Sequence, residues 1–198
     1  MPANIERNYR NMPIVQLRSE QQKLETDYYF EGYATKFNEP YLLYEFEDGQ
    51  KIYEEIDRNA FDGCDMSDVI LQLNHEGKVY ARQSNKTLFL EANQSGLLCY
   101  GDLGKSEASK QIHEEIKSGL LTKMSFGFVI AEEKYNKETH TRTILKIKKL
   151  YDVSVVSIPA NDNTYIQARS FADGVYQQEL EECKKKDLEL LKFRMKGI

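Results

Sequence analysis

The 198-residue sequence lacks several features that mark whole classes of protein. Its three cysteines are widely spaced and include no Cys-x-x-Cys pair, so neither a disulfide framework nor a structural zinc site is indicated, and a reducing compartment fits best. No apolar run approaches the roughly 20 residues of a membrane span. The N-terminal residues are too polar for a secretory signal. We therefore expect no membrane association.

Excess positive charge is also missing. The formal net charge is −5, which gives no general reason to expect nucleic acid as a partner. The acidic residues between positions 54 and 65 match no EF-hand or other metal spacing, and no glycine-rich phosphate loop is present. We expect no metal, no nucleotide and no other cofactor.

What the sequence does contain is a series of short segments typical of β-strands. They are rich in aromatic and β-branched residues and are separated by turn residues, with Asp48-Gly49 as a hairpin signal. The expected strands cover 28–37, 41–46, 51–56, 68–74, 79–82, 87–91, 96–103, 122–130, 142–148 and 150–158, with 79–82 and 87–91 forming one pair. A polar leader over 1–26, with an edge strand at 14–17, precedes a strand-rich domain over 27–170.

Two segments have the pattern of a helix. The first runs from about Ser106, a plausible N-cap, to Ser118, with Gly119 beyond its end. The second covers 176–198 and has a narrow apolar stripe made by Leu188, Leu191 and Met195. Residues 171–198 are therefore expected to be a linker followed by an amphipathic helix. That helix could bind a partner or a second copy of the chain, or pack on the domain and only stabilise it.

The strand over 122–130 holds a candidate nucleophile. Met124, Phe126, Phe128 and Ile130 alternate onto one face, which we expect to be the core face. Ser125 then lies on the other face beside Gly127, and a glycine inside a strand often marks a close approach by a ligand. A solvated strand serine with no catalytic role would give the same pattern.

A catalytic serine needs a base and a group that orients the base. His75 ends a strand beside a glycine and is expected to be accessible, whereas His113 and His140 have the surroundings of surface residues. Asp152 lies on a strand face with apolar neighbours, where it needs a hydrogen-bonded partner. It could orient the base, or it could simply cap a backbone amide.

A set of short motifs occurs in a fixed order along residues 28–170. The set comprises Phe30-Glu31-Gly32-Tyr33-Ala34, Phe37-Asn38, Asn59-Ala60-Phe61, Leu73-Asn74-His75-Glu76, Ala81-Arg82, Thr87-Leu88, Gly96-Leu97, Met124-Ser125-Phe126-Gly127-Phe128, Val153-Ser154-Val155-Val156 and Pro159-Ala160. Each motif is weak by itself, but the ordered set is specific. It resembles the prohead proteases of tailed bacteriophages, which act in capsid maturation.

This resemblance implies a β-rich α+β fold: a β-barrel like that of the herpesvirus assembly proteases, with surface helices and a C-terminal helix. It implies a serine endopeptidase acting inside the assembling prohead, in the host cytoplasm, on capsid precursor and scaffold segments and on itself. Ser125 would be the nucleophile, His75 the base and Asp152 the third member, for which His140 is the alternative.

Further expectations follow from the same resemblance. The oxyanion donors would be backbone amides near Pro159-Ala160, and self-cleavage would fall in the polar segment 169–174 or in the leader. The chain would be slow or silent until assembly concentrates it. The alternative function is a non-catalytic assembly or scaffolding protein that uses the barrel as a binding module.

Overall fold

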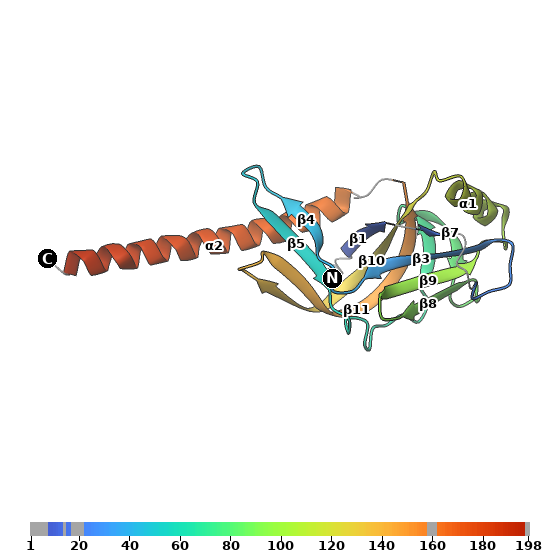
Figure 1. Cartoon of the computed structure of the whole chain (residues 1–198), viewed down its shortest axis with the longest axis horizontal. Helices are drawn as coiled ribbons and strands as arrows, with labels where there is room; N and C mark the ends of the chain where they lie inside the picture. The colour runs from blue at the N-terminus through green and yellow to red at the C-terminus, as the bar shows by residue number, and fades with distance from the viewer. Residues whose placement is uncertain (1–7, 14, 17–21, 158–161, 197–198) are drawn as a thin grey trace, which may run out of the picture.

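A computed structural model describes residues 8–13, 15–16, 22–157 and 162–196. The described strands form two sheets, with helix α1 (Glu107–Lys117) beside them at one end of the body and helix α2 (Asp162–Lys196) running out at the other (Figure 1). The order along the chain is strands β1 to β9, α1, the long strands β10 and β11, and then α2.

The larger sheet has seven strands and the smaller has four. The larger contains β1 (Asn8–Pro13), β4 (Tyr41–Glu45), β5 (Lys51–Ile56), β6 (Ile70–Leu73), β7 (Glu76–Arg82), β10 (Lys123–Asn136) and β11 (Thr141–Val156). The smaller contains β2 (Val15–Gln16), β3 (Tyr29–Lys36), β8 (Leu88–Ala92) and β9 (Gly96–Asp102).

Strand β11 is the axis of the larger sheet. It pairs antiparallel with β10 along one edge. Along its other edge it pairs in parallel with β5 through its first residues and with β6 through its last. Strand β1 pairs antiparallel with the outer edge of β10, which gives the local order β1, β10, β11, β6 and β7. This order decides which side chains meet at the site.

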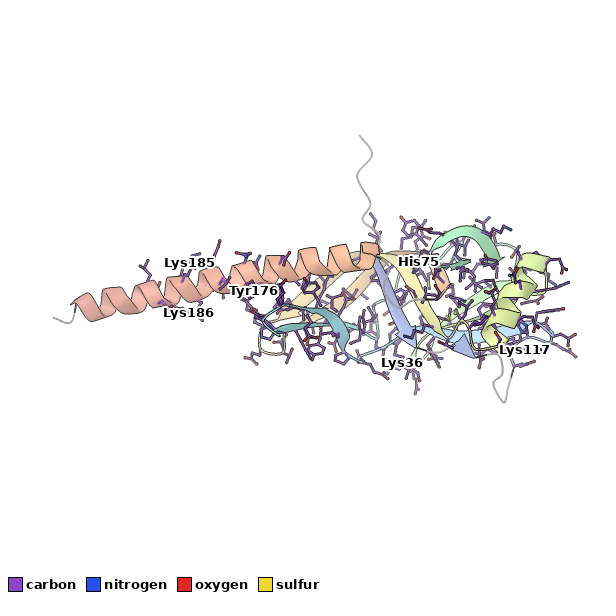
Figure 2. The ribbon with its side chains drawn as sticks, turned by 90° about the horizontal axis from the view of Figure 1, so that it is seen from above. Lys36, His75, Lys117, Tyr176, Lys185 and Lys186 are labelled. Atoms are coloured by element: carbon purple, nitrogen blue, oxygen red, sulfur yellow. The ribbon has the colours of Figure 1, made fainter. Side chains whose placement is uncertain are left out.

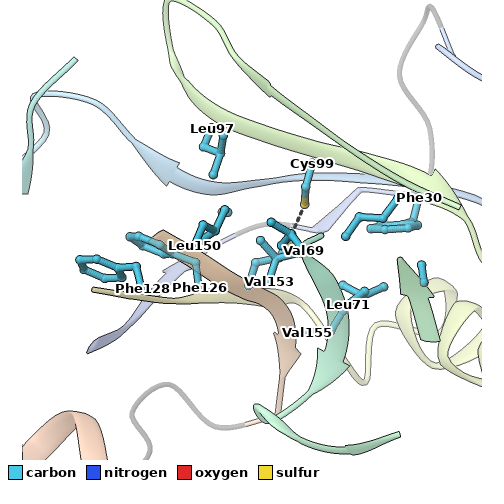
Figure 3. Close-up of a cluster of buried hydrophobic side chains, with 14 of the residues drawn as sticks. Phe30, Val69, Leu71, Leu97, Cys99, Phe126, Phe128, Leu150, Val153 and Val155 are labelled. Atoms are coloured by element: carbon cyan, nitrogen blue, oxygen red, sulfur yellow. Dashed lines mark hydrogen bonds between the residues drawn. The ribbon is translucent and has the colours of Figure 1, made fainter. Parts of the chain in front are cut away.

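The hydrophobic core lies between the two sheets, as the close-up in Figure 3 shows. Met124, Phe126 and Phe128 are all fully buried, which confirms the predicted core face of β10. The rings of Phe126 and Phe128 stack with their centroids 4.6 Å apart. Cys99 from the smaller sheet meets Met124 across the gap, with the two sulfur atoms 3.4 Å apart. The core therefore ties β10 firmly to the smaller sheet.

Several local predictions are confirmed. The β4–β5 hairpin closes at Gly49, whose φ of 87° is one that glycine adopts without strain. Helix α1 begins after Ser106, whose hydroxyl accepts a hydrogen bond from the backbone N–H of Ser109. Gly119, with φ of 77°, follows the end of this helix. Sequence-local turn and cap chemistry decides these features, and packing elsewhere does not alter them.

One predicted strand pairing is wrong, and the predicted closed barrel is not detected in the described part of the chain. The segments 79–82 and 87–91 do not pair with each other: β7 pairs with β6 in the larger sheet, and β8 pairs with β9 in the smaller. Residues 83–87, between β7 and β8, carry the chain from one sheet to the other. No closed barrel is detected among the described strands, which form two separately hydrogen-bonded sheets.

The predicted helix start at 176 is also wrong, because α2 begins at Asp162 and includes Asp173 and Gly174. Its first half packs against β4, β5 and the β10–β11 hairpin through a second apolar cluster built on Ile52, Ala172 and Val175. The predicted exposed linker at 169–174 is thus helical, and Ala172 within it is fully buried. Amphipathic periodicity at the end of the chain is visible in the sequence, whereas this contact with a distant hairpin is not.

The second half of α2 projects beyond the sheets, and Lys185 and Lys186 on it stand clear of the body (Figure 2). Leu188, one of the three residues of the predicted stripe, is 53% exposed. The side chains of the other two, Leu191 and Met195, lie outside the described set. Among the described helices, none is long and apolar enough to cross a membrane.

The predicted leader over 1–26 contains regular structure. Residues 8–13 form β1 on the edge of β10, and Val15–Gln16 form β2 on the edge of β3. The predicted edge strand at 14–17 is thus confirmed for its two central residues, while residues 14 and 17 lie outside the described part. The N-terminal segment contributes one strand to each sheet.

Candidate active site

The paired strands β10 and β11 bring the candidate nucleophile and the candidate acid onto one face. Ser125 lies directly opposite Ser154 in the register, and Gly127 lies opposite Asp152. Residues opposite each other in antiparallel strands share a face, so all four positions face the same way. Because Gly127 has no side chain, this face leaves room for a bridging group between the hydroxyl of Ser125 and the carboxylate of Asp152.

The imidazole of His75 is that bridging group, and a tight turn delivers it. Strand β6 ends at Leu73 and β7 begins at Glu76, so Asn74 and His75 form a two-residue hairpin turn. Both have positive φ, 52° and 60°, which is the backbone of a type I′ turn. Asn tolerates this conformation well, whereas His does so less readily. Backbone strain at such a residue is held by its surroundings and is common at functional sites.

The turn is fixed to the end of β11 by hydrogen bonds. The backbone N–H of Asn74 donates to the carbonyl of Val155 over 3.0 Å. The side-chain amide of Asn74 donates to the Ser157 hydroxyl over 3.0 Å, and the Ser157 backbone N–H donates to Asn74 Oδ1 over the same distance. These contacts set the position of the histidine relative to Asp152.

Three side chains form a continuous chain of hydrogen bonds. With the imidazole neutral and its proton on Nδ1, the Ser125 hydroxyl donates to His75 Nε2 over 2.6 Å. His75 Nδ1–H then donates to Asp152 Oδ1 over 2.5 Å. The structure therefore brings together Ser125, His75 and Asp152, in the order that a serine nucleophile, its base and an orienting acid require.

Ser154 is a fourth member of the cluster, and the sequence did not single it out. Its hydroxyl donates to Asp152 Oδ1 over 2.9 Å and accepts a hydrogen bond from the backbone N–H of His75 over 3.2 Å. It thus holds both the acid and the backbone of the base. The sequence signals for it are its spacing, two residues after Asp152 on the same strand face, and its place in the motif Val153-Ser154-Val155-Val156.

The burial of the cluster differs from what the sequence indicated. Ser125 is fully buried, and the side chains of His75 and Asp152 are each 3% exposed. The accessible serine and accessible histidine expected from sequence are therefore corrected. Ser125 does point away from the core face of β10, but the β6–β7 turn and the edge strand β1 both lie against its strand. Such burial strengthens electrostatic interactions within the cluster.

The other two histidines lie elsewhere. His140 sits at the tip of the β10–β11 hairpin, where its Nδ1 is 2.9 Å from the hydroxyl of Tyr135. Asp152, rather than His140, occupies the position beside His75 Nδ1. The expectation that His113 is a surface residue is wrong: it is 6% exposed, with its ring packed edge-on against Tyr28 at 5.4 Å.

Two further expectations concern the oxyanion donors and metal binding. Pro159 and Ala160, near which the oxyanion donors were expected, lie outside them. Within the described ranges, no three His, Cys, Asp or Glu side chains are grouped so as to hold a metal ion. Burial raises the pKa of the Cys64 thiol to about 11, so this cysteine stays protonated at neutral pH and is a poor competitor for Ser125 as a nucleophile.

Comparison with known proteins places the chain in a family. It is 30% identical over 148 residues to the prohead protease of Enterobacteria phage HK97, a match that covers 74% of this chain and 62% of that protein. The chain thus spans less than two thirds of the length of this relative. No solved structure matches it significantly. The model of the family described as caudovirus prohead serine protease matches residues 15–184, nearly the whole chain. The chain therefore belongs to the caudovirus prohead serine protease family.

Proposed function

We propose that this protein is the serine endopeptidase of phage capsid maturation, and that it cleaves capsid precursor and scaffold segments inside the assembling prohead. The observation that carries the proposal is the unbroken hydrogen-bond chain from Ser125 through His75 to Asp152 in a member of this protease family. A binding module has no need of a buried serine that donates to a histidine. The arrangement therefore favours the enzyme over the scaffolding alternative.

The proposed mechanism is acyl transfer. As Ser125 Oγ attacks the carbonyl carbon of the scissile peptide bond, its proton passes to His75 Nε2. Asp152 stabilises the imidazolium that forms, helped by the hydroxyl of Ser154. His75 then gives this proton to the leaving amine, and the C–N bond breaks. Water, activated by the same histidine, hydrolyses the ester and regenerates the serine.

The proposal includes self-cleavage and control by assembly. The helical backbone at 169–174 makes the leader the better candidate for self-cleavage, because a protease binds its substrate in an extended form. Confinement inside the prohead would raise the concentration of protease and capsid precursor together, and the projecting half of α2 is available for contact with those proteins or a second copy.

We also propose that the two sheets share their ancestry with the herpesvirus assembly proteases. An experimental structure that superposes on neither sheet of those enzymes would overturn this.

Co-expression with the cognate capsid precursor tests the function. We expect trimmed precursor, detected by mass spectrometry, with the wild-type chain and with Ser84→Ala, a control at an exposed serine. The Ser125→Ala variant should leave the precursor intact, since loss of the nucleophile lowers the rate by about six orders of magnitude. Equal trimming by Ser125→Ala would place the nucleophile elsewhere. No trimming by any variant in capsids that still assemble would favour the scaffolding function.

A further inference from the structure

Strand β10, which carries Ser125, has two edges, and they are occupied differently. Along one edge lies β11, joined to β10 by a hairpin and carrying Asp152 and Ser154. Along the other edge lies β1, with Asn11 directly opposite Ser125 in the register. Strand β1 ends the order of the larger sheet, so it is the outermost strand on this side.

The base and the acid both approach Ser125 from the β11 side. Asp152 is on β11, and His75 follows β6, which is itself paired with β11. His75 Nε2 therefore receives the Ser125 proton on that side. A peptide carbonyl that Ser125 attacks has to come within about 3 Å of Oγ without displacing the imidazole. The side that remains for the substrate is the one on which β1 lies.

Something must move before a substrate can reach the serine, because Ser125 is fully buried. Of the two described strands that pair with β10, β11 carries part of the hydrogen-bond chain and cannot leave without destroying it. The other, β1, carries no member of the chain. The family match covers residues 15–184 and therefore begins after β1.

The composition of β1 makes it a weak strand. Its six residues include Asn8, Asn11 and Pro13, and both residue types are depleted in strands. Pro13 has no N–H to donate to β10. The following strand, β2, pairs with β3 at Val15 and Gln16 in the other sheet. If β1 leaves, β2 keeps the chain attached close by, and return is fast because the connection is short.

From this geometry we propose that β1 is a displaceable plug on the substrate-binding edge of β10. An extended peptide substrate replaces it, pairing with β10 through its backbone as an added strand beside Ser125. The proposal rests on the proposed function, since it concerns access to the same serine. It explains how an assembled hydrogen-bond chain coexists with a covered nucleophile: the backbone hydrogen bonds lost by β1 are regained by the substrate.

A reversible cross-link between β1 and β10 tests the proposal. Pro13 and Lys123 are opposite each other in the register, at the spacing a disulfide requires. The variant Pro13→Cys/Lys123→Cys is made with Cys183→Ser, which removes the exposed native thiol. We expect oxidation to slow labelling of Ser125 by a fluorophosphonate, and trimming of capsid precursor, by at least about tenfold, and dithiothreitol to restore both.

The matched control is a cross-link between another pair of antiparallel strands, away from Ser125. Glu45 and Lys51 are exposed and opposite each other in β4 and β5, so Glu45→Cys/Lys51→Cys in the same background should form a disulfide with no effect on labelling. Deletion of residues 1–13 is the complementary change and should speed labelling of Ser125. If the shortened chain fails to fold, the cross-linked variant still decides, because it retains every strand.

The outcomes separate this proposal from the proposed function. Equal labelling rates in the oxidised and reduced forms, with the cross-link verified by mass spectrometry, would overturn the role of β1 and leave the protease intact. Labelling that persists in Ser125→Ala would show that the nucleophile lies elsewhere, which overturns the proposed site and the role of β1 together. Slower labelling only in the oxidised β1–β10 variant, lost on reduction, supports the plug.

Discussion

The two ends of the β10–β11 hairpin both bury polar side chains, and they do so in opposite ways. At the end that carries Ser125 and Asp152, the polar groups form a linear relay, in which each donates to the next. At the other end, the Arg142 guanidinium donates to Glu54 and to Glu133, and lies 4.1 Å over the ring of Phe171 from α2. Tyr41 also donates to Glu54.

The difference shows how one pair of strands serves two purposes. Arg142 and Glu54 are buried charges of opposite sign, and their network joins β5, β10, β11 and α2 in a fixed arrangement. At the other end, His75 can take the proton of Ser125 without a large movement of any heavy atom, because Nε2 and Oγ are 2.6 Å apart. A charge network suits anchoring, whereas the hydrogen-bond chain suits proton transfer, because only the chain contains an imidazole that can take up a proton and give it back.

The largest effect is expected from breaking the relay at its acid. In Asp152→Asn, the amide favours the histidine tautomer with its proton on Nε2, which cannot accept the proton of Ser125. The rate of precursor cleavage should fall by about 10⁴-fold with little change in stability. Asp68→Asn makes the same chemical change at an exposed site and should cleave at the wild-type rate. Cleavage at the wild-type rate by Asp152→Asn would remove Asp152 from the mechanism.

Breaking the Arg142–Glu54 network should lower the stability of the fold and leave the catalytic chemistry unchanged. Arg142→Met removes the guanidinium that pairs with the fully buried carboxylate of Glu54, and breaking such a buried pair costs about 3–5 kcal/mol. Urea denaturation should show this as a lower midpoint, while the cleavage rate of the folded fraction stays unchanged. Lys134→Met, on the exposed part of the same hairpin, is the control. A stability equal to that of wild type would mean that the network contributes no anchoring.

Ser154 is expected to give an intermediate effect, because it touches both the acid and the backbone of the base. Ser154→Ala removes a donor from Asp152 and the hydroxyl that accepts the hydrogen bond from the backbone N–H of His75, a change of about 1–3 kcal/mol. If half of that loss falls on the transition state, kcat/KM decreases by roughly two- to twelvefold. Ser67→Ala, at an exposed serine, should leave kcat/KM unchanged. An unchanged kcat/KM for Ser154→Ala would assign Ser154 a purely structural role.

The smallest effect is expected between the two ends, where Asp65 bridges to Lys149 at the surface. The hydrogen bond from Lys149, with further bonds from Ser67, lowers the pKa of Asp65 to about 2. Since the folded pKa lies below the unfolded one, the carboxylate stabilises the fold above pH of about 4 and loses this effect as pH falls toward about 2. The difference in unfolding midpoint between wild type and Asp65→Asn should narrow over that interval. A difference independent of pH would show that charge is not its cause.

Several features of the fold and of the candidate site are predictable from the sequence. Alternation along 122–130 separates Ser125 from its apolar neighbours, and the apolar surroundings of Asp152 indicate that it needs a partner. The Asp48-Gly49 turn and the cap at Ser106 are decided by local chemistry. These features follow from residues close in sequence, or from periodicity within one strand.

The rest depends on contacts between distant segments. Nothing in the local sequence Asn74-His75-Glu76-Gly77 predicts the positive φ of His75. The pairing of β6 with both β7 and β11 imposes it. The start of α2 was missed because Ala172 and Val175 find their apolar partners more than a hundred residues earlier, around Ile52. The pairing of β1 with β10 beside Ser125 is likewise a contact between distant segments. The polar composition of β1 does not predict a strand.

The two-residue turn at Asn74-His75 has a consequence for which changes of length this chain can accept. Catalytic bases carried on long loops tolerate insertions and deletions nearby, because slack in the loop absorbs the change. Here the base is one of the two residues of the shortest hairpin connection, so a residue added or lost between Leu73 and Glu76 would move the imidazole relative to Asp152. We therefore expect this chain to tolerate changes of length better elsewhere, at its surface loops or in the projecting helix.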